Sequence, residues 1–257
     1  MNTLHIWLAA LPAMAVLGLL AWLIASARRN VGLVDVFWSL FFLAATAVYA
    51  LAAAAPGPRA LLVIALVLAW SLRLAIHLAR RNWSAPEDHR YQLIRARNQP
   101  GFAWKSLYLV FGLQVVLAWI ISAPLLGALL GHRAFGALDV LGVLLSGFGI
   151  GFEALADLQL ARFKSLAANA GKVMDQGLWR YSRHPNYFGE CCVWWGFYLL
   201  AASAGAWWSL FSPLLMTVLL LKVSGVALLE KDIAGRRPAY RDYMARTNAF
   251  LPGVPRP

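Results

Sequence analysis

A chain of 257 residues in which 61% are hydrophobic and 13% are charged does not have the composition of a water-soluble globular protein. Its 23 basic residues outnumber its 11 acidic residues and give a formal net charge of +12. These basic residues are dispersed and accompany no nucleic-acid-binding motif, which argues against a nucleic-acid partner. The composition instead predicts a polytopic, all-α membrane protein.

Long apolar segments predict seven membrane-spanning helices, because about 20 apolar residues are needed for one helical crossing. The last two helices divide one uncharged stretch that is too long for a single crossing, at the small residues 202–206. The first segment has no charged start and no cleavage pattern, so we expect a retained span and not a signal peptide. The expected helices cover residues 5–27, 32–54, 60–79, 106–130, 137–158, 186–203 and 207–229.

The positions of lysine and arginine predict the orientation, since basic residues concentrate in cytoplasmic loops. Most of them follow the first, third, fifth and seventh expected helices, the last group including Lys231, Arg236 and Arg237. The opposite side has Arg59 and Arg133. We therefore expect an external N-terminus and a cytoplasmic C-terminus. Anionic membrane lipids are expected partners of the basic face, and no obligate protein partner is evident.

A polar run interrupts the apolar pattern where the sixth expected helix begins. Proline is favoured at the first helical position, so Pro185 predicts a helix start whose free N–H groups face the basic side chains of Arg180, Arg183 and His184. Asn186 and Glu190 lie one turn apart and share a face just inside the membrane. This pattern predicts a site for an anionic ligand. The alternative is an anchor in which Arg and Tyr reach lipid headgroups.

Other polar residues lie near the same membrane face. Glu153 and Asp157 are four residues apart in an apolar span, so at least one needs a cation, a proton or donor groups from a ligand. A structural pairing with Arg162, Lys164 or Lys222 is the alternative. Glu230 ends the seventh helix, and in the expected amphipathic segment 230–257 the side chains of Tyr240 and Tyr243 either cap a pocket or anchor the chain at the interface.

In the N-terminal half, Asp35 opens the second expected helix, and Arg73 and His77 share a face of the third. A structural pair between Asp35 and Arg73 is one interpretation. The loop 80–105 carries the dense polar run 87–91 and is expected to be solvated.

The two cysteines, Cys191 and Cys192, are adjacent and lack the spacing of metal ligands. We predict two buried, inert thiols and no metal site.

The run from Gly177 to Glu190, which reads GLWRYSRHPNYFGE, resembles the C-terminal signature of the steroid 5-alpha-reductase-like membrane enzymes, especially their bacterial branch of undefined substrate. Further segments resemble the same branch, namely 34–38, 87–91, 153–159, 163–164, 229–231 and 240–252. The likeness therefore extends over nearly the whole chain, taken as one membrane domain, 1–257.

This resemblance implies a seven-helix reductase. The Ala-rich composition predicts a bacterial cytoplasmic membrane. Residues 1–135 would hold a lipophilic steroid-, enone- or isoprenoid-like substrate, and residues 136–257 would hold NADPH, whose hydride reduces a carbon–carbon double bond. The implied cofactor-binding residues are Asp157, Lys164, Arg180, Arg183, His184, Asn186, Tyr187, Glu190, Glu230, Tyr243 and Arg246.

The proton donor does not follow from the resemblance. The steroid reductases carry a Gln–Glu pair in their second helix, and no such pair occurs between Val31 and Ala55. Asp35 is the nearest acid, and Asp35, His77 and Tyr91 are the candidate catalytic residues.

Two other classes of function stay open. The Arg-His-Pro-aromatic pattern also resembles the isoprenylcysteine carboxyl methyltransferases, which hold S-adenosylmethionine. The crowded arginines favour NADPH, because S-adenosylmethionine has no phosphate. A non-catalytic membrane scaffold is the third class.

Overall fold

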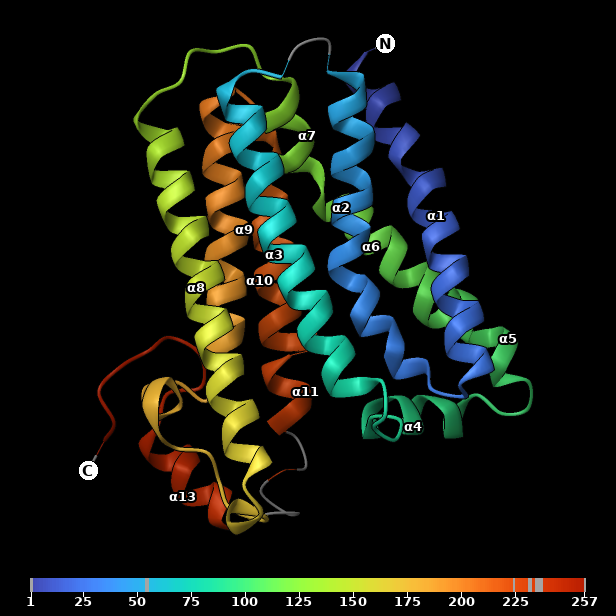
Figure 1. Ribbon diagram of the computed structural model, residues 1–257, viewed down its shortest axis with the longest axis vertical. Helices are drawn as coiled ribbons and strands as arrows, with labels where there is room; N and C mark the ends of the chain where they lie inside the picture. Colours follow the sequence, from blue (N-terminus) through green and yellow to red (C-terminus); the bar gives the residue numbers. More distant parts are fainter. Residues whose placement is uncertain (1, 54–55, 224, 231–232, 234–237, 257) are drawn as a thin grey trace. The chain divides into compact units, whose positions relative to one another are not determined.

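The computed structural model describes residues 2–53, 56–223, 225–230, 233 and 238–256, and the regular elements in these ranges are all helical (Figure 1). The predicted all-α class is therefore confirmed. Several positions that the sequence predictions include lie outside these ranges: residue 54, residue 224, Lys231, Arg236 and Arg237.

The protein is an integral membrane protein by the length and composition of its helices. Large apolar side chains such as Leu20, Leu61 and Leu144 are exposed along them, as expected of surfaces that contact lipid. Helix α9 (Pro185–Ser203), the predicted sixth span, carries Asn186 and Glu190 and is not among the candidate spans of the described residues. The count of seven spans and the orientation of the termini stay predictions. In the part of the chain described, six stretches are candidate spans: Thr3–Ala27, Val31–Ala52, Pro58–Asn82, Phe102–Leu130, Ala137–Ser165 and Trp207–Glu230.

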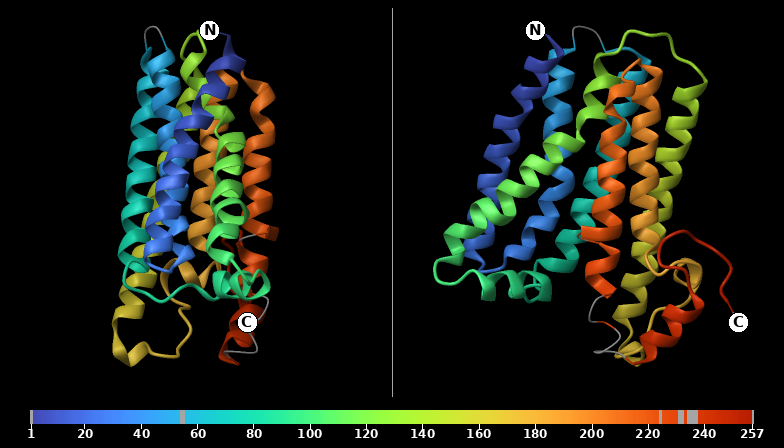
Figure 2. Two further views of the ribbon diagram at one scale, coloured as in Figure 1. Left: turned by 90° about the vertical axis from the view of Figure 1, so that its right-hand side faces the viewer. Right: turned by 180° about the vertical axis from the view of Figure 1, so that it is seen from behind.

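The chain divides into two compact units, Met1–Asp139 with Leu200–Ser209, and Val140–Leu199 with Leu210–Pro257. In the first unit α1 (Thr3–Ala27), α2 (Val34–Ala52) and α3 (Pro58–Asn82) lie side by side (Figures 1 and 2). Helix α2 packs between its two neighbours.

Helix α6 (Leu113–Ile121) packs against α1 through a reciprocal tryptophan pair. The indole of Trp7 donates to the Trp119 carbonyl over 3.2 Å, and the indole of Trp119 donates to the Trp7 carbonyl over 2.9 Å. The two rings stack with their centroids 4.2 Å apart. Both indole N–H groups are thus satisfied inside an apolar contact.

The prediction of a loop over residues 80–105 was wrong in part. Helix α3 continues to Asn82, and α4 (His89–Arg97) and α5 (Phe102–Ser106) follow. Helix α4 begins here because the Asp88 carboxylate accepts a hydrogen bond from the Arg90 amide over 2.9 Å, which is an N-cap. Figures 1 and 2 show α4 lying across the lower ends of the long helices of its unit.

The predicted fourth helix is present but irregular. It starts as α5, passes through a π-helical segment at Leu107–Gly112, and breaks at Ser122 before α7 (Ala123–Leu130). Pro124 explains the break, because proline lacks the N–H that would continue the helix.

The second unit contains most of α8 (Ala137–Ser165), which runs two turns beyond the predicted end at 158, and most of α9. The two helices touch at glycines. A Cβ added to Gly189 would lie 2.8 Å from the Glu153 Cβ, so a side chain there would separate the helices. The unit also contains α10 (Phe211–Val218), a π segment (Leu219–Val223), α11 (Val226–Glu230) and α13 (Ala239–Arg246).

The predicted break in the last long apolar stretch is confirmed. Helix α9 ends at Ser203, and a 3-10 turn begins at Trp207. Gly205 lies between them with φ of 94°, a backbone conformation that favours glycine.

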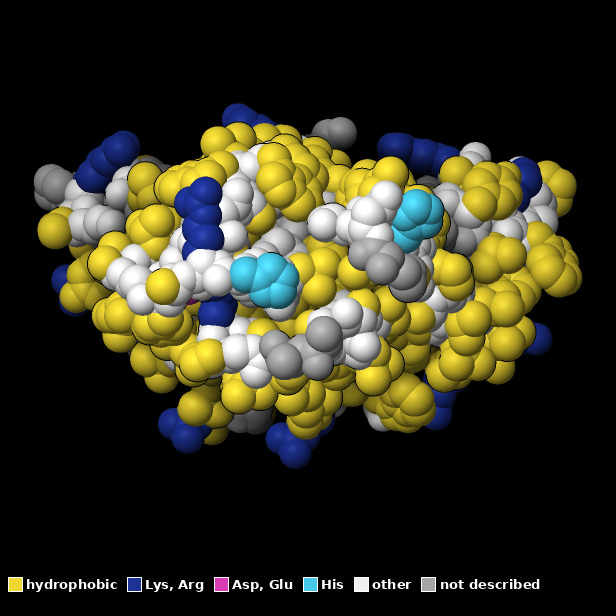
Figure 3. All heavy atoms as spheres, turned by 90° about the horizontal axis from the view of Figure 1, so that it is seen from above, with side chains coloured by type: hydrophobic (Ala, Val, Ile, Leu, Met, Phe, Trp, Pro, Cys, Tyr) yellow, Lys and Arg dark blue, Asp and Glu magenta, His cyan; other side chains and the backbone are white. Residues whose placement is uncertain are grey.

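Figure 3 shows hydrophobic side chains over most of the face seen from above, with lysine and arginine side chains mainly around its margin. Arg59, one of the two arginines predicted to lie on the external side, is buried and forms an ion pair. Its Nε and Nη2 donate to the two Asp139 oxygens over 2.6 and 2.9 Å. Its remaining donors reach the carbonyls of Arg133 and Ala134, both at 3.0 Å, and the Ser203 hydroxyl donates to Asp139.

We expect Arg59→Met to destabilise the first unit strongly. The change leaves the Asp139 carboxylate buried without its cation, a loss worth about 3–5 kcal/mol. Thermal unfolding in detergent measures the effect. The matched control is Arg133→Met, which removes an exposed guanidinium from the same connection. Equal melting temperatures for the two variants would contradict the prediction.

Candidate functional site

The first polar cluster lies in the second unit, where the loop before α9 folds onto α8. The loop amide of Leu178 donates to the Gln159 side-chain oxygen over 2.9 Å, and the indole of Trp179 donates to the Ala156 carbonyl over 3.0 Å. Gly177 has φ of 58°, and a Cβ there would lie 2.6 Å from that Gln159 oxygen. Glycine is thus required at 177, and Gln159 fixes the loop.

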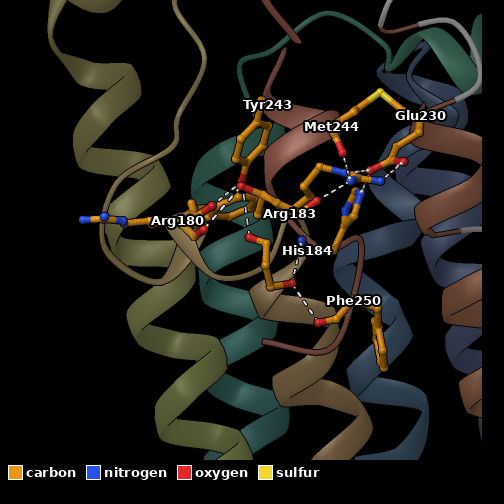
Figure 4. A network of polar contacts seen from close by, with 10 residues as sticks. Arg180, Arg183, His184, Glu230, Tyr243, Met244 and Phe250 are labelled. Carbon is orange, nitrogen blue, oxygen red and sulfur yellow. Dashed lines mark hydrogen bonds and ion pairs between the residues drawn. The ribbon is translucent and has the colours of Figure 1, made fainter. Parts of the chain in front are cut away.

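The centre of this cluster is a bidentate ion pair between Arg183 and Glu230 (Figure 4). The Arg183 Nε and Nη2 donate to the two Glu230 oxygens over 2.7 and 2.8 Å. The His184 Nε2 lies 2.9 Å from the same carboxylate. All three side chains are largely buried. The sequence predictions included all three residues without expecting them to bind one another.

Arg183 also holds the C-terminal segment in place. Its Nη1 donates to the carbonyls of Met244 and Thr247, over 3.0 and 2.5 Å. Burial alone would lower the pKa of the guanidinium, but the hydrogen bonds and charge of Glu230 raise it overall. Arg183 is therefore a permanent cation with four of its five N–H groups bound to protein acceptors.

Further hydrogen bonds attach the loop to the segment around α13, and two of them come from side-chain hydroxyl groups of Ser182 and Tyr243. The Ser182 hydroxyl donates to the Phe250 carbonyl over 2.8 Å, and the Tyr243 hydroxyl donates to the Trp179 carbonyl (Figure 4). Burial, and then the neighbouring Tyr240, raise the pKa of Tyr243, so it stays a neutral donor. The predicted amphipathic helix is present as α13, with both of these tyrosines buried and Arg241 and Asp242 exposed.

Other basic residues among those predicted to bind the cofactor lie at the surface. Arg180, Lys164 and Arg246 are exposed. Figure 4 shows the Arg180 side chain pointing away from the Arg183–Glu230 pair. This arrangement separates the basic residues into a buried structural group and an exposed group that a ligand in water can reach.

A second feature of this unit is a set of buried polar side chains on α8 and α9. Glu153, Asp157 and Glu190 are 3%, 6% and 7% exposed. The Asn186 amide nitrogen donates to the Asp157 carboxylate over 3.2 Å. Tyr187 stacks on His184 with ring centroids 5.6 Å apart. The structure thus brings predicted cofactor-binding residues of two helices into contact.

The second polar cluster lies in the first unit. The Tyr91 hydroxyl donates to one Asp35 oxygen over 2.5 Å, and Arg90 donates to the other over 3.2 Å. Burial, and then the Asp35 charge, raise the pKa of Tyr91 well above its usual value. Two of the three candidate catalytic residues are therefore hydrogen-bonded partners, while the third, His77, lies half-buried on α3.

The loop before α4 is fixed by Glu87. Its carboxylate accepts hydrogen bonds from the Val31 amide and from Arg95, each over 2.8 Å. Burial opposes ionisation of Glu87, but the hydrogen bonds from Arg95 and the Val31 amide lower its pKa overall. A charged Glu87 thus connects the start of α2 to the helix that carries Tyr91.

The unit also contains a cavity of about 670 Å³, lined by the ends of α2 and α7 and the start of α3. It lies at the end of α2 opposite Asp35, so it is separate from the Tyr91 cluster.

The sequence predictions missed Gln114 on α6, whose amide nitrogen donates to the Tyr91 hydroxyl over 3.4 Å. The sequence could have indicated Gln114, because a side-chain amide in an otherwise apolar span is costly unless it binds a partner.

These features define an all-helical integral membrane protein with buried polar side chains gathered in each of its two units. A family model described as "Protein of unknown function (DUF1295)" matches residues 21–247, so the chain belongs to the DUF1295 family. A curated protein of Schizosaccharomyces pombe, described as uncharacterised, is 27% identical over 270 residues, which cover 92% of this chain and 77% of that protein. No solved structure shows a significant match.

We expect Arg183→Met to release the segment 239–256 from the loop before α9. Breaking the buried pair costs about 3 kcal/mol, which increases the open population about a hundredfold. Limited trypsinolysis, with Arg241 and Arg246 as reporter sites, measures the opening. Arg180→Met is the control, because it removes an exposed arginine from the same loop. Similar cleavage rates in both variants would show that the ion pair does not hold the segment.

Proposed function

We propose that this protein is a membrane-embedded reductase that uses NADPH to reduce a carbon–carbon double bond of a lipophilic substrate. The observation that carries the proposal is the set of polar side chains on α8 and α9, with a basic loop fixed next to it. Glu153, Asp157 and Glu190 are buried, and the half-buried Asn186 binds Asp157. Ionisable side chains in apolar helices are costly and indicate a functional site. The resemblance of 177–190 to the steroid 5-alpha-reductase-like enzymes supports the same assignment.

The donor and acceptor groups of this set fit a dinucleotide. Carboxylates and an amide can bind the hydroxyl groups of ribose and the carboxamide of nicotinamide. Arg180, Lys164 and Arg246 are exposed and can supply positive charge to phosphate groups. We assign Arg183 and His184 a positioning role, since Glu230 already binds both.

In the first unit, we propose Tyr91 as the proton donor. Reduction of a double bond adds a hydride to one carbon and a proton to the other, and bound NADPH supplies the hydride. The protein must supply an acid that stays protonated at neutral pH, and the raised pKa of Tyr91 meets that condition. Without substrate the phenol donates this proton to Asp35, whose charge Arg90 compensates. Protonation of the substrate therefore requires the Tyr91 hydroxyl to turn from Asp35 to the bound substrate.

We expect Asn186→Ala and Glu190→Ala each to weaken NADPH binding by a factor of about 5 to 150 while leaving the folded yield similar. Each change removes a hydrogen-bonding group that costs about 1–3 kcal/mol to lose. Calorimetric titration of the detergent-solubilised protein measures the affinity. Gln176→Ala is the control, because it removes an exposed side-chain amide from the preceding loop.

The same titration separates the three classes of function. Binding of S-adenosylmethionine and not of NADPH would favour a methyltransferase and contradict the reductase proposal. Binding of neither molecule would favour a scaffold. Unchanged NADPH affinity in both alanine variants would show that Asn186 and Glu190 do not bind the cofactor.

We expect Tyr91→Phe to lower turnover by a factor of about 100 to 10,000, the usual contribution of a general acid, with NADPH affinity unchanged. NADPH oxidation in the presence of a panel of lipophilic enones measures turnover. Tyr108→Phe is the matched control, because Tyr108 is 62% exposed on the neighbouring π segment. Equal rates for the two variants would exclude Tyr91 as the proton donor.

A further inference from the structure

Gln114 leaves a hydrogen-bond acceptor open beside the Tyr91–Asp35 pair. Its Nε2 lies 3.4 Å from the Tyr91 hydroxyl. Its Oε1 is buried and accepts no hydrogen bond from the part of the chain that the structure describes. A buried carbonyl of this kind is costly to leave unmet, so a partner from outside the chain is expected.

The chemistry of the neighbouring groups fixes the orientation of the amide. The single proton of Tyr91 is directed to Asp35 at 2.5 Å, so the phenol oxygen can only accept from Gln114. The Gln114 nitrogen must therefore face Tyr91, and its carbonyl must point elsewhere. An interchange of the two amide atoms would set one acceptor against another.

The backbone next to Gln114 is also unusual. The π-helical segment Leu107–Gly112 ends directly before α6, and π segments occur frequently at functional sites. Two residues of this segment, Val110 and Phe111, belong to the same buried apolar cluster as the Tyr91 ring. Leu113 and Val116, on either side of Gln114, are 53% and 44% exposed. An apolar ligand from the lipid phase could thus reach this part of α6.

We propose that the Gln114 carbonyl accepts a hydrogen bond from a hydroxyl group of an apolar ligand that binds in the first unit. This inference rests on the proposed reductase and narrows its substrate class to lipophilic compounds that carry a hydroxyl group. Gln114 is then a specificity-determining residue, distinct from the proton donor Tyr91.

Binding of matched alcohol and ether probes tests the proposal. The probes are geraniol, farnesol and geranylgeraniol, each compared with its methyl ether, which has the same apolar body and no donor. Affinity is measured from thermal shifts of the full chain in nanodiscs without NADPH. We expect the wild type to prefer the alcohol about tenfold in at least one pair. We expect Gln114→Met, which keeps the side-chain length and removes the acceptor, to bind both members equally.

Equal binding of alcohol and ether by the wild type in all three pairs overturns the proposal, as does a preference that persists in Gln114→Met. An ordered water that satisfies the Gln114 carbonyl would give the first of these results. Gln114→Leu replaces the methionine variant if the latter does not fold. The probes are tested without NADPH, so the two proposals can fail separately. If the wild type prefers the alcohol but does not bind NADPH in the separate titration, the reductase function is excluded and the hydroxyl-binding site at Gln114 is retained.

Discussion

The constraint that governs this structure is that a polar group inside the hydrocarbon region must have a fixed partner. The helices satisfy the backbone, and side chains follow the same rule. In the first unit, Tyr49 and Ser122 are hydrogen-bonded at 2.7 Å, and the Ser39 hydroxyl donates to the Ser71 carbonyl over 2.9 Å. A polar side chain in such surroundings is held in one geometry, which is the condition that a binding or catalytic site needs.

The loops are held by the same kind of interaction. Arg183 joins the loop before α9 to α11 and to the segment after α13, and Glu87 joins the loop before α4 to α2. Loops usually carry function but lack rigidity. A buried charge that uses most of its hydrogen-bonding capacity supplies that rigidity, because any displacement of the loop would leave the charge unsatisfied.

The apolar pattern predicted the positions of the long helices well, because hydropathy is the property that the bilayer selects. It missed α4 and the last two turns of α8, because these helical segments are rich in polar residues and are therefore not marked by hydropathy. It could not predict the partners of the site residues. Glu230 lies 47 residues from Arg183, and Tyr91 lies 56 residues from Asp35, so the pairs depend on tertiary packing. In the sequence, a basic residue that binds a ligand looks the same as one that holds a loop in place. The sequence therefore could not separate Arg183 from Arg180.

The polar group around Asp157 and Asn186 differs from the one around Tyr91, and the difference bears on the class of function. The cluster around Asp157 and Asn186 combines buried acids with exposed basic residues, which suits a polar, charged ligand. The cluster around Tyr91 places a few connected polar side chains next to apolar ones, which suits a lipophilic ligand with one polar group. A scaffold has no need of either, since replacing a buried charged pair with apolar residues is often neutral or stabilising. An enzyme that brings a water-soluble cofactor to a lipid-soluble substrate needs both.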